Sequence, residues 1–198
     1  MSTISAALPA IETPWRLPSR GRVGMFYLIA AESAIFTIFV VAYIFYIGKS
    51  LSGPTPQQVL RIPIFNTICL LSSSLTIHLA VKALSAGKNA TFKSFWFLTL
   101  ALGAVFLIGT GREWYHLIYE EGLTISTNLF GTTYYSLVGL HAFHVTAGLV
   151  GLSVVMLLAL AGWVRQEHAR HVDVLSLYWH FVDVVWVVVF TVVYIIGR

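Results

Sequence analysis

The sequence predicts an all-α fold: a polytopic membrane protein, a bundle of five transmembrane helices, with its N-terminus in the cytoplasm and its C-terminus outside. Of its 198 residues, 58% are hydrophobic and only 10% are charged, whereas a soluble domain has about 25% charged residues. Five apolar segments are long enough to cross a bilayer. Lysine and arginine gather at one set of segment ends. We attribute the net charge of +4 to this loop topology and not to nucleic-acid binding.

Residues 1–22 are predicted to form an N-terminal cytoplasmic tail, and residues 23–198 the five-helix transmembrane domain. The tail does not resemble a cleavable signal, because it lacks a basic n-region and contains Pro9. The one cysteine, Cys69, lies inside an apolar span and has no partner for an internal disulfide. The predicted helices cover residues 23–47, 62–82, 91–121, 131–164 and 172–196.

Turn-forming and polar segments delimit each helix. The Gly/Pro/Ser-rich segment 48–56 ends the first helix. Pro63 lies in the first turn of the second helix, where its missing N–H costs nothing. Loops at residues 85–91, 122–128 and 165–171 precede the other three helices.

The orientation follows from the positive charges that flank the helices. Eight lie on the side assigned to the cytoplasm and four on the other side. The eight are Arg16, Arg20, Arg22, Lys82, Lys88, Lys93, Arg165 and Arg170, and the four are Lys49, Arg61, Arg112 and Arg198.

Glu32 lies about a third of the way into the first helix, among Ala31, Ala34 and Ile35. A carboxyl group in an apolar span is either protonated or has a partner. Two interpretations remain open. Glu32 holds a proton or positions a lipid headgroup, or it makes an interhelix hydrogen bond that fixes the packing.

Small polar residues and paired histidines predict packing faces on two helices. Asn66 and Ser73 belong to a second helix rich in hydroxyl groups, which let membrane helices approach closely and hydrogen-bond. His141, His144 and Gly148 share a face of the fourth helix. The two histidines either bind a metal or haem or hydrogen-bond within this packing face; the sequence contains no Cys-x-x-Cys-His motif for covalent haem.

Two further pairs of ionisable residues lie in the third and fifth helices. Glu113 and His116 are one turn apart near a predicted membrane interface, which suits either a polar interfacial cluster or a proton-handling site. Ser176, His180 and Asp183 share one face of the fifth helix. Because ionisable groups are costly in lipid, we expect this face to contact another part of the protein.

Five motifs in order resemble subunit III of the haem-copper terminal oxidases, over nearly all of residues 23–197. The match in the fifth helix is the most specific. The motifs are Ala31-Glu32-Ser33; Pro63 and Asn66 followed by Ser72-Ser73-Ser74; Gly103, Phe106 and Glu113; the paired histidines His141 and His144 with Gly148; and Trp179-His180-Phe181-Val182-Asp183-Val184-Val185-Trp186.

The chain also departs from this family. Many members have seven helices, and this chain is similar to the shorter form that lacks the first two. The lipid-filled cleft of the long form is therefore expected to be open or completed by another subunit. Thr110 stands where glutamine is common, Trp114 where tyrosine is usual, and Ala142 where glycine commonly follows the first histidine.

The resemblance implies a non-catalytic subunit of a proton-pumping cytochrome c oxidase that reduces oxygen to water, in a bacterial cell membrane. It implies that the chain packs on subunit I, associates with subunit II, binds phospholipid, and supports proton uptake and turnover stability. Haem and copper are expected in the partner subunits, with no cofactor or metal in this chain, and cytochrome c is expected to contact the complex elsewhere. The candidates for proton uptake or lipid binding are Glu32, Glu113, His116, His180 and Asp183.

Several alternatives remain. Quinol oxidases and some nitric oxide reductase systems contain a similar subunit III. A stand-alone di-haem cytochrome b would use histidines among His78, His141, His144 and His180 as ligands. A small transporter is disfavoured, because paired helices broken by Gly or Pro are absent from the sequence.

Overall fold

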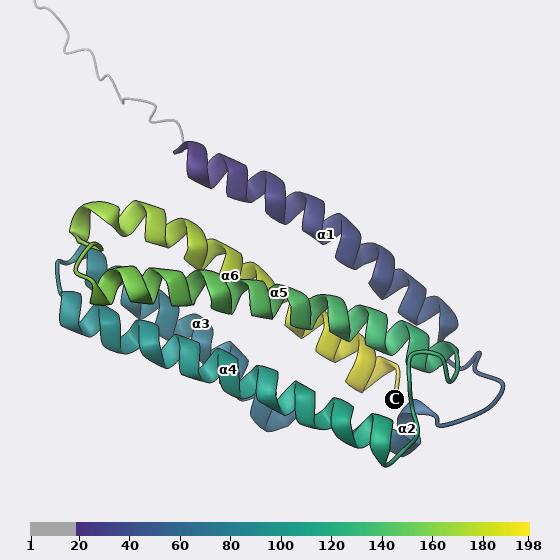
Figure 1. The fold of residues 1–198 in the computed structure, drawn as a ribbon. Helices are drawn as coiled ribbons and strands as arrows, with labels where there is room; N and C mark the ends of the chain where they lie inside the picture. The colour runs from purple at the N-terminus through teal and green to yellow at the C-terminus, as the bar shows by residue number, and fades with distance from the viewer. Residues whose placement is uncertain (1–18) are drawn as a thin grey trace, which may run out of the picture.

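The computed structural model describes residues 19–198, which form a bundle of long helices aligned side by side (Figure 1). The regular structure within this range is entirely helical. Among the described residues, five helices are long and apolar enough to cross a membrane, which confirms the predicted all-α bundle of five transmembrane helices. The elements are α1 (Arg20–Tyr46), α2 (Pro56–Val59), α3 (Ile64–Ser85), α4 (Asn89–Tyr119), α5 (Leu129–Leu160), the 3-10 helix η1 (Gln166–His168), α6 (Ala169–Phe190) and the π-helical η2 (Thr191–Ile196).

Side-chain caps decide where two of the long helices begin. The hydroxyl of Ser19 accepts a hydrogen bond from the backbone of Arg22 at 3.4 Å, so α1 starts at Arg20, within the segment assigned to the tail. Asn128 caps α5 in the same way, accepting from the backbone of Gly131 at 2.8 Å. Caps satisfy the free N–H groups of a first turn and extend a helix beyond its apolar run. Residues 1–18 of the predicted tail lie outside the described residues.

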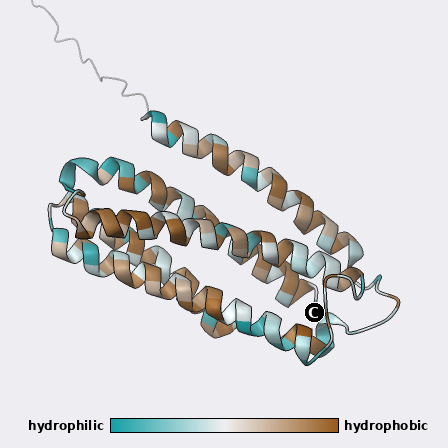
Figure 2. Cartoon of the chain, in the orientation of Figure 1, coloured by the Kyte–Doolittle hydropathy of each residue, from teal (hydrophilic) through white to brown (hydrophobic). Residues whose placement is uncertain are grey.

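The bundle has two helices at its centre. α5 contacts α1, α4 and α6, while α6 contacts α1, α3 and α5. α3 packs along α4, and α1 lies at the edge of the bundle (Figure 1). Figure 2 shows apolar residues along the middle of the long helices and polar residues gathered near their ends.

Trp179 of α6 fills the contact between the central helices. Its ring is fully buried, and a Cβ built on Gly148 would lie 2.8 Å from it. A Cβ on Gly103 would lie 2.9 Å from the same ring. The two glycines therefore let α4 and α5 approach Trp179 from two sides, as small residues do at membrane helix contacts.

Indole N–H groups link the helices in the interior. Trp179 donates to the hydroxyl of Ser73 in α3 at 2.8 Å, and Trp186 donates to Thr67 in α3 at 3.2 Å. Trp96 of α4 donates to the carbonyl of Leu152 in α5 at 2.9 Å. These bonds satisfy the N–H groups of the three indoles and fix the register of neighbouring helices.

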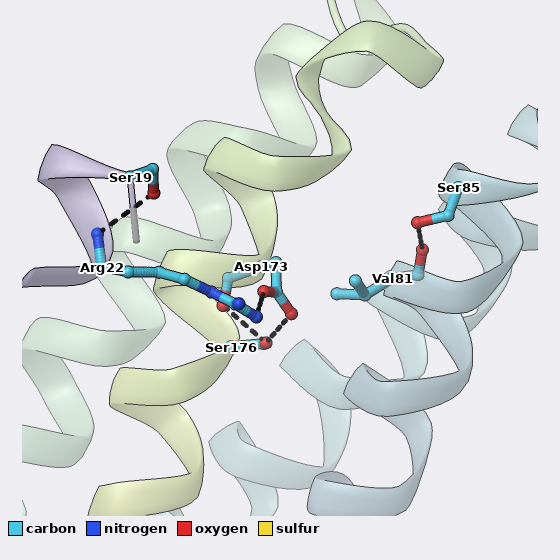
Figure 3. Close-up of polar contacts among 6 residues, drawn as sticks. All are labelled: Ser19, Arg22, Val81, Ser85, Asp173 and Ser176. Atoms are coloured by element: carbon cyan, nitrogen blue, oxygen red, sulfur yellow. Dashed lines mark hydrogen bonds and ion pairs between the residues drawn. The ribbon is translucent and has the colours of Figure 1, made fainter. Parts of the chain in front are cut away.

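One end of the bundle, here called the N-end, contains the starts of α1 and α6 and the end of α3. Arg22 of α1 forms an ion pair with Asp173 of α6 at 2.5 Å, and the Ser176 hydroxyl donates to the Asp173 carbonyl at 2.8 Å (Figure 3). Gln166 donates to the carbonyl of Ser85 at 2.8 Å. The opposite end, which contains the ends of α1, α4 and η2, is called the C-end.

Candidate functional site: polar clusters inside the bundle

The first cluster joins α1 to α5. An oxygen of Glu32 lies 3.0 Å from Nε2 of His144, and both side chains are largely buried. Nδ1 of His144 lies 2.7 Å from the carbonyl oxygen of Leu140. The ring of Phe36 packs against the imidazole, with centroids 4.9 Å apart. Tyr178 donates to the His144 carbonyl at 3.1 Å, which ties α6 to the same turn.

The geometry of this cluster limits its protonation states. A carbonyl oxygen only accepts, so Nδ1 of His144 must donate to Leu140. Nε2 and Glu32 then share one proton: either the carboxylic acid donates to a neutral imidazole, or an imidazolium donates to a carboxylate. The pair has no net charge in either form, which meets the requirement that ionisable groups in a membrane be paired. The arrangement can hold a proton and exchange it between two atoms.

His141 has different surroundings from His144. Its ring is buried and stacks on Trp186 with centroids 5.0 Å apart, and Phe106 meets it edge-on at 5.8 Å. Neither ring nitrogen has a hydrogen-bond partner among residues 19–198. The two histidines of the predicted shared face therefore have different environments: His144 is hydrogen-bonded, whereas His141 is surrounded by aromatic rings.

A second cluster joins α3 to α6. The hydroxyl of Ser74 lies 2.9 Å from Nδ1 of His180 and donates to Asp183. The second oxygen of Asp183 is buried and has no partner among the described residues. Ser176, on the same side of α6, bonds instead to Asp173. The expected contact with another part of the protein is thus made by His180 and Asp183 through α3.

A third cluster lies near the C-end. Glu113 of α4 accepts a hydrogen bond from the hydroxyl of Tyr194 at 2.9 Å, and Tyr134 of α5 lies 3.4 Å from the same hydroxyl. His116 contacts Glu120 at 2.7 Å and Glu121 at 3.5 Å. The Glu113 and His116 side chains therefore have separate partners, although they are one turn apart.

An apolar groove of about 530 Å³ lies between α1 and α6. Phe36 and Val40 line it from α1, and Phe181 and Val184 line it from α6. His180 is its ionisable lining residue. Its apolar lining has the chemistry to hold an acyl chain.

A comparison with known protein families identifies the chain's relatives. The family model for cytochrome c oxidase subunit III matches residues 19–198. The chain belongs to this family. The resemblance inferred from the five motifs is confirmed, and the chain is a multi-pass membrane protein that serves as an accessory subunit of an oxidoreductase complex.

Individual relatives of the subunit III family extend this result. The chain is 39% identical over 183 residues to cytochrome c oxidase subunit 3 of Synechocystis sp., covering 90% of this chain and 77% of the relative. It is 36% identical over 182 residues to the same subunit of Bacillus sp., covering 88% and 85%. It is 34% identical over 178 residues to cytochrome bo(3) ubiquinol oxidase subunit 3 of Pseudomonas aeruginosa, covering 88% and 84%.

The histidines of this subunit III chain are not arranged as ligands to one metal. Within residues 19–198 no group of three or more His, Cys, Asp or Glu side chains could hold a metal ion. His144 uses both nitrogens in hydrogen bonds to Leu140 and Glu32. His141 packs against the aromatic rings of Phe106 and Trp186.

The structure also places residues that sequence reasoning set aside or did not single out. Ser74 was treated as a packing hydroxyl, yet it bridges His180 and Asp183. Tyr194 donates to Glu113 and is hydrogen-bonded to Tyr134, and neither tyrosine was a candidate. A tyrosine within the valine-rich end of the fifth predicted helix was the available signal, since a buried phenol needs a partner. Asn66, predicted as a packing residue, lies directly against Gly109 of α4.

Proposed function

We propose that this chain is the non-catalytic subunit III of a proton-pumping cytochrome c oxidase that reduces oxygen to water in a bacterial cell membrane. In this proposal the chain packs on subunit I, associates with subunit II, and contains no redox centre. Haem and copper belong to the partner subunits, and cytochrome c contacts the complex elsewhere. The observation that carries the proposal is the match of residues 19–198 to the subunit III family, and the Glu32–His144 pair supports its proton-uptake part.

The pair supports a role in proton uptake. Glu32 lies in the half of α1 nearer the N-end, which the charge distribution assigns to the cytoplasm. A pair that shares one proton without net charge can take up or release a proton close to where a pump collects it. His180 and Asp183, which Ser74 joins to α3, act as secondary candidates. Glu113 and His116 lie toward the C-end and belong to the opposite surface.

The α1–α6 groove supports phospholipid binding. Its apolar walls suit acyl chains, and Arg20 and Arg22 lie in the first turn of α1 at the N-end, where a phosphate would meet them. Bound lipid would fill the groove and stabilise the loosely packed α1 during turnover.

Subunit III of a quinol oxidase is the second candidate, and one observation favours it. The similar Pseudomonas aeruginosa protein is a subunit of a ubiquinol oxidase, so relatives of this chain include both kinds of complex. A subunit III of a nitric oxide reductase system has no such observation behind it. The stand-alone di-haem cytochrome b is disfavoured by the surroundings of His141 and His144.

The proposal is tested by purifying the complex through a tag on this chain in mild detergent, and by expressing the chain alone. We expect the haem Soret band in the complex and none in the lone chain. Oxygen uptake should be supported by reduced cytochrome c, and uptake with quinol alone would select the second candidate. A Soret band in the lone chain would contradict the accessory role and make the histidines ligands.

A further inference from the structure

We propose that the outward surface of α3 and α6 is the docking surface for a transmembrane helix of another oxidase subunit, and that this helix presents an acidic or hydrogen-bonding side chain to His78. The proposal rests on the proposed function, because the partner belongs to the same complex. This surface, called the α3–α6 face, consists of Leu71, Leu75 and His78 from α3 and His180, Val184 and Val187 from α6. His180 and Val184 also border the α1–α6 groove, so the partner helix would lie beside the lipid proposed for that groove.

His78 provides the first argument. It lies seven residues before the end of α3 at Ser85, which places it about 10 Å inside the helix end. Its side chain is exposed, and it makes no hydrogen bond or ion pair with the rest of residues 19–198. An ionisable side chain at this depth normally faces protein or a polar cavity rather than lipid. The surface around His78 is therefore covered by protein in the complex.

A second imidazole lies on the same face. Ser74 is one turn before His78 on α3, so the two side chains project in the same direction. Ser74 contacts Nδ1 of His180 at 2.9 Å. His180 is only partly buried, and its ring borders the open groove. Two histidines from adjacent helices thus share one exposed surface in the apolar part of the bundle.

The opposite side of the bundle has a different chemistry at the same depth. The outward face of α5 presents Phe143, Val150 and Val154, which are 68%, 59% and 50% exposed. The nearby hydroxyl of Thr146 donates to the carbonyl of Ala142 in its own helix at 2.8 Å. This face therefore presents apolar side chains to lipid, whereas the α3–α6 face also carries the exposed ionisable side chain of His78.

The depth of His78 selects a protein partner over a lipid. Phosphate and glycerol groups of a phospholipid lie at the interface, outside the hydrocarbon core. A transmembrane helix can present Asp, Glu, Ser or Asn within that core, and such side chains bind imidazole by hydrogen bonds or charge. Leu71 and Leu75 beside the histidine would supply the apolar contact around that bond.

The first experiment places a photo-crosslinking benzoylphenylalanine at Leu75 or, as the control, at Val150, in the full chain in native membranes. The two positions are matched, because Leu75 lies ten residues before Ser85 and Val150 ten residues before Leu160. Their exposed fractions are 62% and 59%. We expect a crosslink to another oxidase subunit from position 75 and none from position 150. Crosslinks from Val150 alone, from both positions equally, or from neither would overturn the proposal.

The second experiment uses Leu75→Trp, His78→Leu and the control Val150→Trp, each in the tagged chain. We expect the haem that co-purifies with the chain to fall at least several-fold for the first two variants and to stay at the wild-type level for the control. If both α3 variants retain haem, the docking proposal is refuted, while the proposed function is unaffected. No haem with the wild-type chain would instead refute the proposed function, so the two failures are distinguishable.

Discussion

Glu32 and His144 act as one unit, because each satisfies the hydrogen-bonding group that the other leaves buried. The imidazole is fixed at Nδ1 by the Leu140 carbonyl and at Nε2 by the carboxyl oxygen at 3.0 Å. Removing one partner would leave a buried polar group without its bond, which typically costs about 1–3 kcal/mol. The unit can lose its exchangeable proton only through the Glu32 carboxyl or Nε2 of His144.

Glu32→Gln tests whether this proton matters. Glutamine preserves a hydrogen bond to His144 but has no proton to release at neutral pH. We expect haem content to be unchanged, while steady-state proton uptake slows or inactivation during turnover becomes several-fold faster. Proton uptake and activity decay of the purified complex, reconstituted in vesicles, provide the measurement.

The matched control is Glu113→Gln, which alters a buried carboxyl near the C-end. It should leave proton uptake from the N-end side unchanged. Loss of haem from the Glu32 variant would contradict the prediction, since it would indicate a structural role in assembly.

Residue types could be predicted from the sequence better than their partners. Glu32 and His144 were each singled out, because an ionisable group in an apolar span needs a partner. The pairing itself joins residues 112 positions apart, and Ser74 and His180 are separated by 106 positions. Helical periodicity assigns a residue to a face of its own helix, but it does not say which helix that face meets.

At the scale of helices, Trp179 of α6 determines how closely α4 and α5 approach. The indole lies between Gly103 and Gly148 and donates to Ser73. The ring has no room to move, because it is in contact on both sides and fully buried. The absence of a side chain at Gly103 and Gly148 therefore makes room for the Trp179 ring between α4 and α5.

Gly148→Ala is expected to destabilise the chain. The new Cβ would lie 2.8 Å from the Trp179 ring, and overpacking of this kind typically costs about 1–3 kcal/mol. The midpoint of thermal unfolding in detergent should fall by several degrees.

Gly111→Ala is the matched control, because a Cβ there would have no heavy atom within 4 Å. Its unfolding midpoint should stay unchanged or rise slightly, since alanine favours a helix over glycine. Equal midpoints for the two variants would show that the Trp179 contact does not limit packing.

Helix ends were less predictable than helix interiors. The apolar runs indicated five spans, but Ser19 and Asn128 extend α1 and α5 through polar caps that a hydropathy pattern does not register. The last span also changes from α-helix to the wider π-helix over Thr191–Ile196. Gly197 donates to Val192, five residues earlier, and this local hydrogen-bond choice has no counterpart in residue periodicity.

For the whole molecule, the orientation in the membrane remains a prediction from charge. The N-end carries the greater share of the lysine and arginine residues and should face the cytoplasm. Arg198→Cys in a Cys69→Ser background tests it, because Cys69 is buried and its replacement removes the second thiol. In intact cells, residue 198 should react with membrane-impermeant thiol reagents added outside. Labelling only after the cells are opened would reverse the orientation.

The aromatic rings around His141 have a consequence for proton movement in the whole bundle. Glu32 and Glu113 lie toward opposite ends, and between them the rings of Phe106 and Trp186 close around an imidazole that has no hydrogen-bond partner among residues 19–198. A proton would need a continuous file of oxygen and nitrogen atoms to hop along, and this aromatic layer interrupts it. Among the described residues, no hydrogen-bonded path for protons therefore joins the Glu32 and Glu113 clusters through His141.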